Sequence, residues 1–201
     1  MKKIVFTAVL IMFLTQSCGI YKTYVNLSRL KFKLSSATNI QVAGINVAGK
    51  TKLSDFSAME LLTLSSNVSK GTLPITFTLN IDAKNPNDGT GGFASTNASI
   101  TSFPYRLNIN DKEILSGNIG NPISVPGTGQ VTTIPLQITF DLAQSFSNGS
   151  YQDLVNIAMQ IMGLGNGNSS IQLYARPTVG TSIGNITYPS ELKIVDADFS
   201  N

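Results

Sequence analysis

Residues 73–89 (LPITFTLNIDAKNPNDG) constrain the fold of this chain more than any other stretch. Up to Lys84, apolar or small residues at the odd positions alternate strictly with polar residues or proline at the even positions. Because successive side chains of a β-strand point to opposite faces, this alternation predicts one strand with a buried face and a solvent face. Turn-forming residues then end the strand, and we interpret the first three as a structural turn rather than a binding site. The run is Asn85, Pro86, Asn87, Asp88 and Gly89.

The same period of two recurs along the chain. Residues 133–142 repeat it cleanly, and shorter alternating runs predict strands at 30–34, 40–47, 98–109, 112–119, 171–179 and 191–199. We expect a bulge at Gly44, a turn at Asn110 and Asp111, and a loop or edge segment at 121–130, which holds two prolines and two glycines. Strands with one apolar face form antiparallel sheets, and two stacked sheets bury both apolar faces. The sequence therefore predicts a mainly β fold, an antiparallel β-sandwich of about seven or eight strands.

Two segments have helical spacing instead. In residues 54–68, apolar side chains follow one face of a helix, with Ser54 as a candidate N-cap and Gly71 as a candidate stop. In residues 150–162, Ser150 and Asp153 have the spacing of a capping box, and a glycine-rich run at 163–167 follows the apolar stripe. Both helices are predicted to lie in connections between strands.

Composition narrows the possible functions. Only 12% of the 201 residues are charged, and the chain has one Cys and no His. Without His, a Ser-His-Asp triad is impossible and the commonest zinc ligand is missing, so we expect no catalytic residues, no metal site and no cofactor. The single Cys excludes an intrachain disulfide. The net charge of +3 includes Lys2 and Lys3, and the other 12 basic residues face 11 acidic ones, so no nucleic-acid partner is predicted.

The first residues resemble a bacterial lipoprotein signal peptide. Two lysines precede an apolar run at 4–14, which is too short to span a bilayer comfortably, and Ser17, Cys18 and Gly19 follow. A small residue before the cysteine and a glycine after it are similar to a lipobox, in the looser form found in the Bacteroidetes. The resemblance implies a signal peptide at 1–17, a lipidated Cys18 as the first mature residue, a tether at 18–28 and a folded domain at 29–201.

Lipidation would attach the chain to a membrane. Two or more acyl chains hold a protein stably, whereas one chain binds only marginally. No acidic residue follows Cys18 directly, which is similar to the pattern of outer-membrane lipoproteins that face the periplasm, and exposure at the cell surface is left open. The alternatives are a free cysteine after an ordinary secretory signal, or an uncleaved anchor.

The strand of residues 73–84 and the segments after it resemble the LEA14-like family (late embryogenesis abundant type 2, or WHy domain). The family pattern is an amphipathic strand ending in Asn-Pro-Asn, a strand with a short turn and a glycine, and a second amphipathic strand. Here it falls on residues 79–87, 107–117 and 123–142, and the resemblance covers roughly residues 40–199. It implies a fibronectin-III-like or immunoglobulin-like sandwich with one or two helices, no catalytic residues, and a role in stress and desiccation tolerance.

Three functions are compatible with these features. The first is a non-enzymatic envelope lipoprotein that binds an unknown protein or envelope partner, in stress protection or envelope maintenance. The second is an accessory subunit of an outer-membrane protein complex, with an exposed edge strand that pairs with another chain. The third is a hydrolase that uses two carboxylates, for which Asp82 and Asp141 are candidates.

Overall fold

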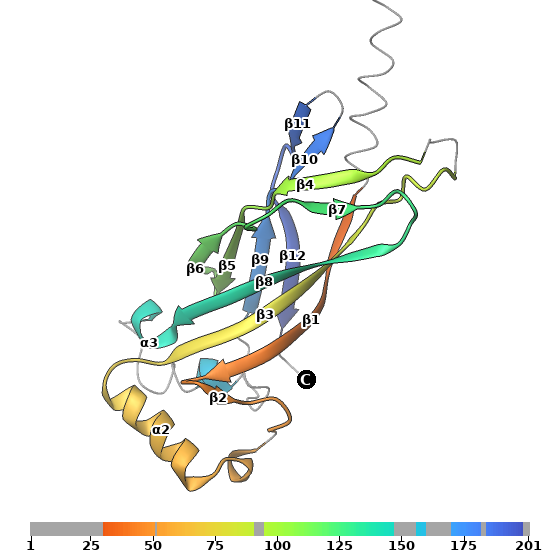
Figure 1. Cartoon of the computed structure of the whole chain (residues 1–201). Coiled ribbons are helices and arrows are strands. Elements are labelled where there is room, and N and C mark those ends of the chain that lie inside the picture. The colour runs from red at the N-terminus through yellow and green to blue at the C-terminus, as the bar shows by residue number, and fades with distance from the viewer. Residues whose placement is uncertain are drawn as a thin grey trace, which may run out of the picture.

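A computed structural model of the chain describes residues 30–50, 52–90, 95–146, 156–159, 170–181 and 184–198. Within these ranges, twelve strands form three antiparallel sheets of four strands each, and helices are few (Figure 1). The fold is mainly β and sandwich-like, as the alternation predicts, but it uses more strands than expected. Within the described ranges, no helix is long and apolar enough to cross a membrane.

The predicted strand at 73–84 is central to the longest sheet. The order of that sheet is β2 (Ile45–Asn46), β1 (Lys31–Val42), β3 (Pro74–Lys84) and β8 (Val131–Asp141). β3 and β8 pair without a register shift from Pro74↔Asp141 to Lys84↔Val131. The odd residues of β3 and the even residues of β8 from Ile134 onward are buried, so both strands present their apolar faces to the same side. β8 is an edge strand, because β3 is its only paired neighbour in the described sheets.

The other two sheets contain the remaining strands: one lies behind the sheet of β3 and β8, and the other lies at the upper end of the molecule (Figure 1). One has the order β12 (Leu192–Asp198), β9 (Ser170–Ala175), β5 (Tyr105–Ile109) and β6 (Lys112–Gly117). The other has the order β11 (Gly184–Thr187), β10 (Thr178–Thr181), β4 (Ala98–Ser102) and β7 (Ile123–Val125). The predicted turn at Asn110 and Asp111 joins β5 to β6, with φ angles of 50° and 61°. β7 is an edge strand, as predicted for residues 121–130.

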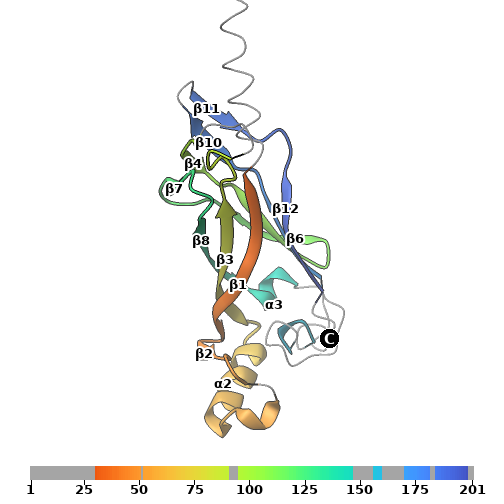
Figure 2. The ribbon, with the colours of Figure 1, turned by 90° about the vertical axis from the view of Figure 1, so that its right-hand side faces the viewer.

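One hydrophobic core joins the layers. Figure 2 shows the sheet of β1, β3 and β8 beside the sheet that contains β12 and β6, with helix α3 (Leu142–Ser145) near their lower ends. Side chains from both layers are completely buried in it: Ile75, Ile81, Ile134, Leu107, Leu173 and Phe103. At ~25 cal/mol per Å² of apolar surface, each such side chain contributes about 1.5–3 kcal/mol of transfer free energy.

The chain reverses at Gly44, where a bulge was expected. Ala43 and Gly44 have φ angles of 51° and 77°, and they connect β1 to β2 as a two-residue hairpin turn. The irregularities lie earlier in β1, between Leu34 and Ser36 and between Thr38 and Gln41. The bulge prediction at Gly44 is wrong because a residue that tolerates positive φ suits a bulge and a tight hairpin equally well.

The first predicted helix begins three residues later than expected. Helix α2 (Ala58–Ser69) is capped by Ser57, not by Ser54, which lies in the short 3₁₀ helix η1 (Leu53–Asp55). The Ser57 side chain accepts from the N–H of Glu60, and the Glu60 carboxylate accepts from the N–H of Ser57 at 2.7 Å. This reciprocal capping box favours Ser57 because only Ser57 has a glutamate three residues ahead. Gly71 ends the helix with a φ of 71°, as predicted.

The segment 171–179 forms two strands, where one was expected. β9 ends at Ala175, and after Arg176 and Pro177 the chain enters β10 in a different sheet. Pro177 has no N–H for a strand ladder, which explains the break. Most of the helix predicted at 150–162 lies outside the described residues, including Ser150 and Asp153, but residues 156–159 are helical.

Candidate functional site

Asn85 is the centre of a hydrogen-bonded corner at the end of β3. Its side chain is completely buried. Nδ2 donates to the carbonyl oxygens of Thr96 at 2.7 Å and Val125 at 3.2 Å. Oδ1 accepts from the backbone N–H of Asn87 at 3.1 Å and from its Nδ2 at 3.0 Å. Both donors and both acceptor positions of the amide are therefore used, as a buried polar group requires.

The corner joins three segments that are distant in sequence. The carbonyl of Asn87 accepts from the N–H of Thr96 at 3.1 Å, and Pro86 between the two asparagines has a fixed φ. Gly127 packs against the same place, where an added Cβ would lie 2.6 Å from the Thr96 carbonyl oxygen. The N–H of Gly127 donates to Asn97 Oδ1 at 2.9 Å. Asn85, Pro86 and Asn87 therefore lie in a packed turn that holds the loops together.

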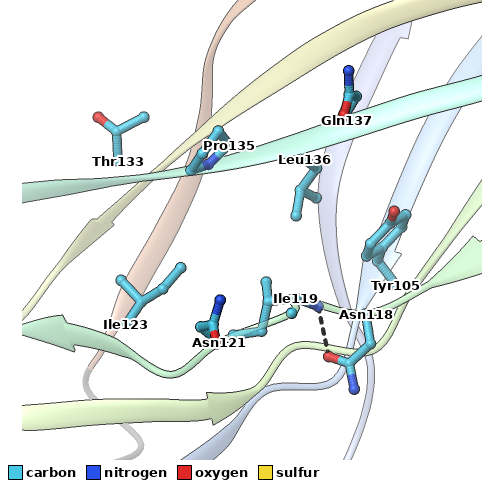
Figure 3. Close-up of a pocket in the computed structure, with 10 residues that line it drawn as sticks. Tyr105, Asn118, Ile119, Asn121, Ile123, Thr133, Pro135, Leu136 and Gln137 are labelled. Atoms are coloured by element: carbon cyan, nitrogen blue, oxygen red, sulfur yellow. Dashed lines mark hydrogen bonds between the residues drawn. The ribbon is translucent and has the colours of Figure 1, made fainter.

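A groove of about 510 Å³ lies along β8 (Figure 3). One side is formed by Thr133, Pro135, Leu136 and Gln137 of β8, and the other by Tyr105 and the segment 118–123. Leu136 and Ile119 point into the groove from opposite sides (Figure 3). All residues that line it are uncharged, and they combine apolar side chains with hydroxyl and amide groups. Such a lining can hold a neutral ligand by apolar contact and hydrogen bonds, and Tyr105 is the titratable side chain in it.

The wall opposite β8 is fixed by Asn118. Its Oδ1 accepts from the N–H groups of Phe103 at 2.6 Å and Ile119 at 2.9 Å, and its Nδ2 donates to Ser102 Oγ at 2.8 Å. Tyr105 lies over Gly117 in the β5–β6 pair, and burial raises the pKa of its hydroxyl above the ordinary value. The groove is thus built on side chains held by the scaffold, which favours a preformed site.

The two carboxylates suggested for hydrolysis do not meet. Asp82 accepts from Thr133 Oγ1 at 3.3 Å, whereas Asp141 accepts from the N–H groups of Leu73 at 3.0 Å and Gln144 at 3.1 Å. Asp82 pairs with Thr133, eight residues before Asp141 on β8, so about 27 Å separates them at ~3.4 Å per residue. Glycosidases need their carboxylates within roughly 5–9.5 Å, which excludes this pair.

The charged groups described elsewhere hold surface elements together. Arg106 binds Glu191 at 2.9 Å and stacks over the Tyr174 ring, with 4.0 Å between guanidinium carbon and ring centroid. The hydrogen bond from Arg106 lowers the pKa of the Glu191 carboxyl. The hydrogen bonds from the Ser57 N–H and from the Lys50 ammonium lower the pKa of the Glu60 carboxyl. Within the described ranges, His, Cys, Asp and Glu form no group of three that could hold a metal ion.

Sequence reasoning missed the groove, and it did not predict the contacts of Asn85 with distant segments. A period of two predicts strands, yet it does not say which strand edge stays unpaired or which loop lies beside it. The available signal was Pro135, since proline inside a strand is confined to edges and bulges. Cys18, the signal peptide at 1–17 and the tether at 18–28 lie outside the described residues.

No protein-family model and no curated protein sequence matches the chain. Among solved structures, a protein from Archaeoglobus fulgidus is 11% identical with a TM-score of 0.37, over 81% of this chain and 98% of its own. The solution structure of a candidate late embryogenesis abundant (LEA) protein is 16% identical with a TM-score of 0.44, over 94% of this chain and 86% of its own. A protein from Arabidopsis thaliana is 13% identical with a TM-score of 0.31, over 62% of this chain and 74% of its own. A LEA protein is thus among the structural neighbours, but such low scores say nothing of what this chain does.

Proposed function

We propose that this chain is a non-catalytic, lipid-anchored envelope protein that acts by binding a partner in the groove beside β8. The observation that carries the proposal is the lining of the groove, which is uncharged on both sides. Acid–base and nucleophilic catalysis most often use His, Asp, Glu, Lys or Cys, and none of these residue types lines the groove. Binding needs shape, apolar surface and a few directed polar groups, which the lining supplies.

The anchor in this proposal is Cys18. Residues 19–30 separate Cys18 from the start of β1, and an extended chain of that length reaches about 40 Å. β1 starts at the end of the molecule where β4, β7, β10 and β11 lie, and α2 lies at the opposite end (Figure 1). In this arrangement the domain stands in the periplasm on the outer membrane, with α2 away from the lipid.

Two biological roles fit a binding protein of this kind. Stress protection or envelope maintenance follows from the sequence resemblance to the LEA14-like family. The second candidate, an accessory subunit of an outer-membrane complex, is favoured by the free edge of β8, because unpaired strand edges are common sites of chain–chain pairing.

The anchor is tested by mass spectrometry of the mature protein from membranes. We expect a chain that begins at Cys18 and carries a diacylglycerol and an N-acyl chain. The matched variant Cys18→Ala should stay unprocessed and leave the outer-membrane fraction. A mature protein that begins at any other residue contradicts the lipoprotein proposal.

The binding role is tested by photo-crosslinking in intact cells. A photoreactive amino acid at position 123 in the groove should give discrete adducts, whereas one at position 185 on β11 should not. One stoichiometric partner favours the accessory subunit, and several partners favour envelope maintenance. Equal adducts from both positions contradict a binding role for the groove. If a deletion strain survives drying as well as the wild type, the role in stress protection is ruled out, but the binding role is not.

A further inference from the structure

The outer edge of β8 carries backbone groups that nothing described in the chain pairs. The N–H of Leu142 donates to the carbonyl of Leu73 at 2.9 Å, in the same register as the β3–β8 ladder. In an antiparallel pair, hydrogen-bonded and non-hydrogen-bonded positions alternate, so the even residues of β8 bond to β3. The odd residues therefore direct their N–H and C=O groups away from β3. Up to Thr139 these residues are Val131, Thr133, Pro135, Gln137 and Thr139.

Pro135 is one of these residues whose backbone groups face away from β3. It is an odd residue, so the N–H that proline lacks is one that would point outward, and the ladder to β3 loses nothing. Val131, Thr133, Gln137 and Thr139 keep outward N–H groups, and all five residues keep outward carbonyls. Natural edge strands are commonly protected by charged side chains, especially lysine. The odd residues from Val131 to Thr139 are exposed and uncharged, so Pro135 is the main protection of this edge.

The groove lies where the next strand of the sheet would lie. Neighbouring strands are about 4.8 Å apart, so a strand added to β8 would occupy the space between β8 and the segment 118–123. The side chain opposite Leu136 would point inward and meet Ile119 and Ile123 on the far wall. No charged residue lines the groove, so an inward charge on the added strand would have no partner.

We propose that β8 binds an extended segment of another protein as a fifth strand of the sheet β2-β1-β3-β8. The segment alternates apolar or small residues, which face Leu136 and Ile119, with polar residues that face solvent. The inference rests on the proposed binding role of the groove and names the class of its partner.

The spacing of the edge groups identifies the partner as a polypeptide. Outward N–H and C=O groups recur at every second residue, about 6.8 Å apart, which is the repeat of another strand. A second copy of this chain fits less well. Its own β8 is flanked by its own segment 118–123, so two such edges cannot enter each other's grooves unless both walls move.

The test measures hydrogen exchange of single amides in the full-length protein in detergent. Without a ligand, the amides of Thr133, Gln137 and Thr139 should exchange fast, while those of Ile134, Leu136 and Ile138 are protected by β3. The probe is an acetylated and amidated heptapeptide of alternating Thr and Val. At saturation it should slow the first three amides by about tenfold or more. The same peptide with aspartate in place of its valines should have no effect.

Two proline variants separate backbone pairing from general damage. Gln137→Pro removes one outward N–H and leaves the β3 ladder intact, and it should weaken peptide binding by about three- to tenfold. Thr187→Pro removes the N–H of an exposed residue on the edge strand β11, outside the groove, and should leave peptide binding unchanged. Thermal unfolding of both variants checks that each one folds.

Each other outcome overturns the inference. Absence of protection at saturating peptide, or protection confined to other strands, rules out strand addition at β8. Concentration-dependent protection without peptide, with a dimer in sedimentation, assigns the edge to a second copy instead. These results leave the anchor and the crosslinks from position 123 untouched, so the proposed function can stand when the strand-addition inference fails.

Discussion

The ring of Tyr105 lies in the space that a side chain at Gly117 would fill: an added Cβ would come within 2.6 Å of its Cζ and Oη atoms. The two residues face each other across the β5–β6 pair, and Tyr105 also lines the groove beside β8. The absence of a side chain at Gly117 therefore sets the position of one groove wall.

Gly117→Ala should displace the Tyr105 ring. We expect a loss of about 1–3 kcal/mol in the free energy of unfolding, the usual range for overpacking, measured by urea denaturation. The matched variant is Gly120→Ala, because Gly120 also lines the groove but has no atom within 4 Å of its added Cβ. It should change stability by less than about 0.5 kcal/mol. If Tyr105→Leu does not relieve the Gly117→Ala defect in a double-mutant cycle, the clash is not its cause.

Asn85→Asp should destabilise the corner strongly. The change removes both N–H donors to Thr96 and Val125 and places a carboxylate where the side chain is fully buried. A loss of about 3–5 kcal/mol is expected, as for a buried charge without a partner. Asn121→Asp makes the same chemical change at an exposed position and should stay within about 0.5 kcal/mol. Urea denaturation at neutral pH measures the free energy of unfolding of both variants. Equal losses would mean that the corner is not packed as described.

Ser57→Ala and Ser54→Ala should differ, because only Ser57 caps helix α2. Removing a capping hydroxyl destabilises a helix by typically about 1 kcal/mol. No residue of α2 is fully buried, so the helix depends on its cap more than on the core. We expect faster amide exchange over Ala58–Ser69 in Ser57→Ala, with little change in Ser54→Ala. The reverse result would assign the cap to Ser54.

Low pH should destabilise the N-terminus of helix α2. The N–H of Ser57 and the Lys50 ammonium lower the pKa of Glu60 from its ordinary value of 4.5. A carboxyl with a lowered folded-state pKa stabilises the fold above its unfolded pKa, and this contribution is lost as the pH falls through the folded value. Exchange over α2 should therefore accelerate below about pH 4.5 once corrected for intrinsic rates. In Glu60→Gln, amide exchange over α2 should depend less on pH. An unchanged pH dependence would contradict a role for the Glu60 carboxylate at the helix start.

High pH should reduce the contribution of Tyr188 to the stability of the fold. Burial raises the pKa of its hydroxyl to about 12, and that hydroxyl donates to the Leu30 carbonyl at 3.4 Å. A group with a raised folded-state pKa stabilises the fold fully below its unfolded value, so this contribution should fall between about pH 10 and pH 12. Tyrosinate absorbance and urea denaturation across this range measure it. Tyr188→Phe should lose this part of the pH dependence, and a Tyr188 that ionises near pH 10 would contradict the burial.

The sequence by itself determined the amphipathic strands β3 and β8, their buried faces and several turns. Strict alternation in β3 and β8 predicts which side chains enter the core, because a strand has only two faces. Asn110 and Asp111 indicate their turn, which joins β5 to β6. These features depend on residues that are neighbours in the chain.

Tertiary structure alone decided the partners of the strands, the number of sheets and the groove. Whether β8 lies in the middle of a sheet or at its edge depends on where β5, β6 and β7 lie, and alternation within β8 is the same in both cases. The link from Asn85 to Val125 spans 40 residues, and the contact of Tyr105 with Gly117 depends on the register between two strands. Local pattern cannot specify such contacts, because they are selected by the packing of the whole core.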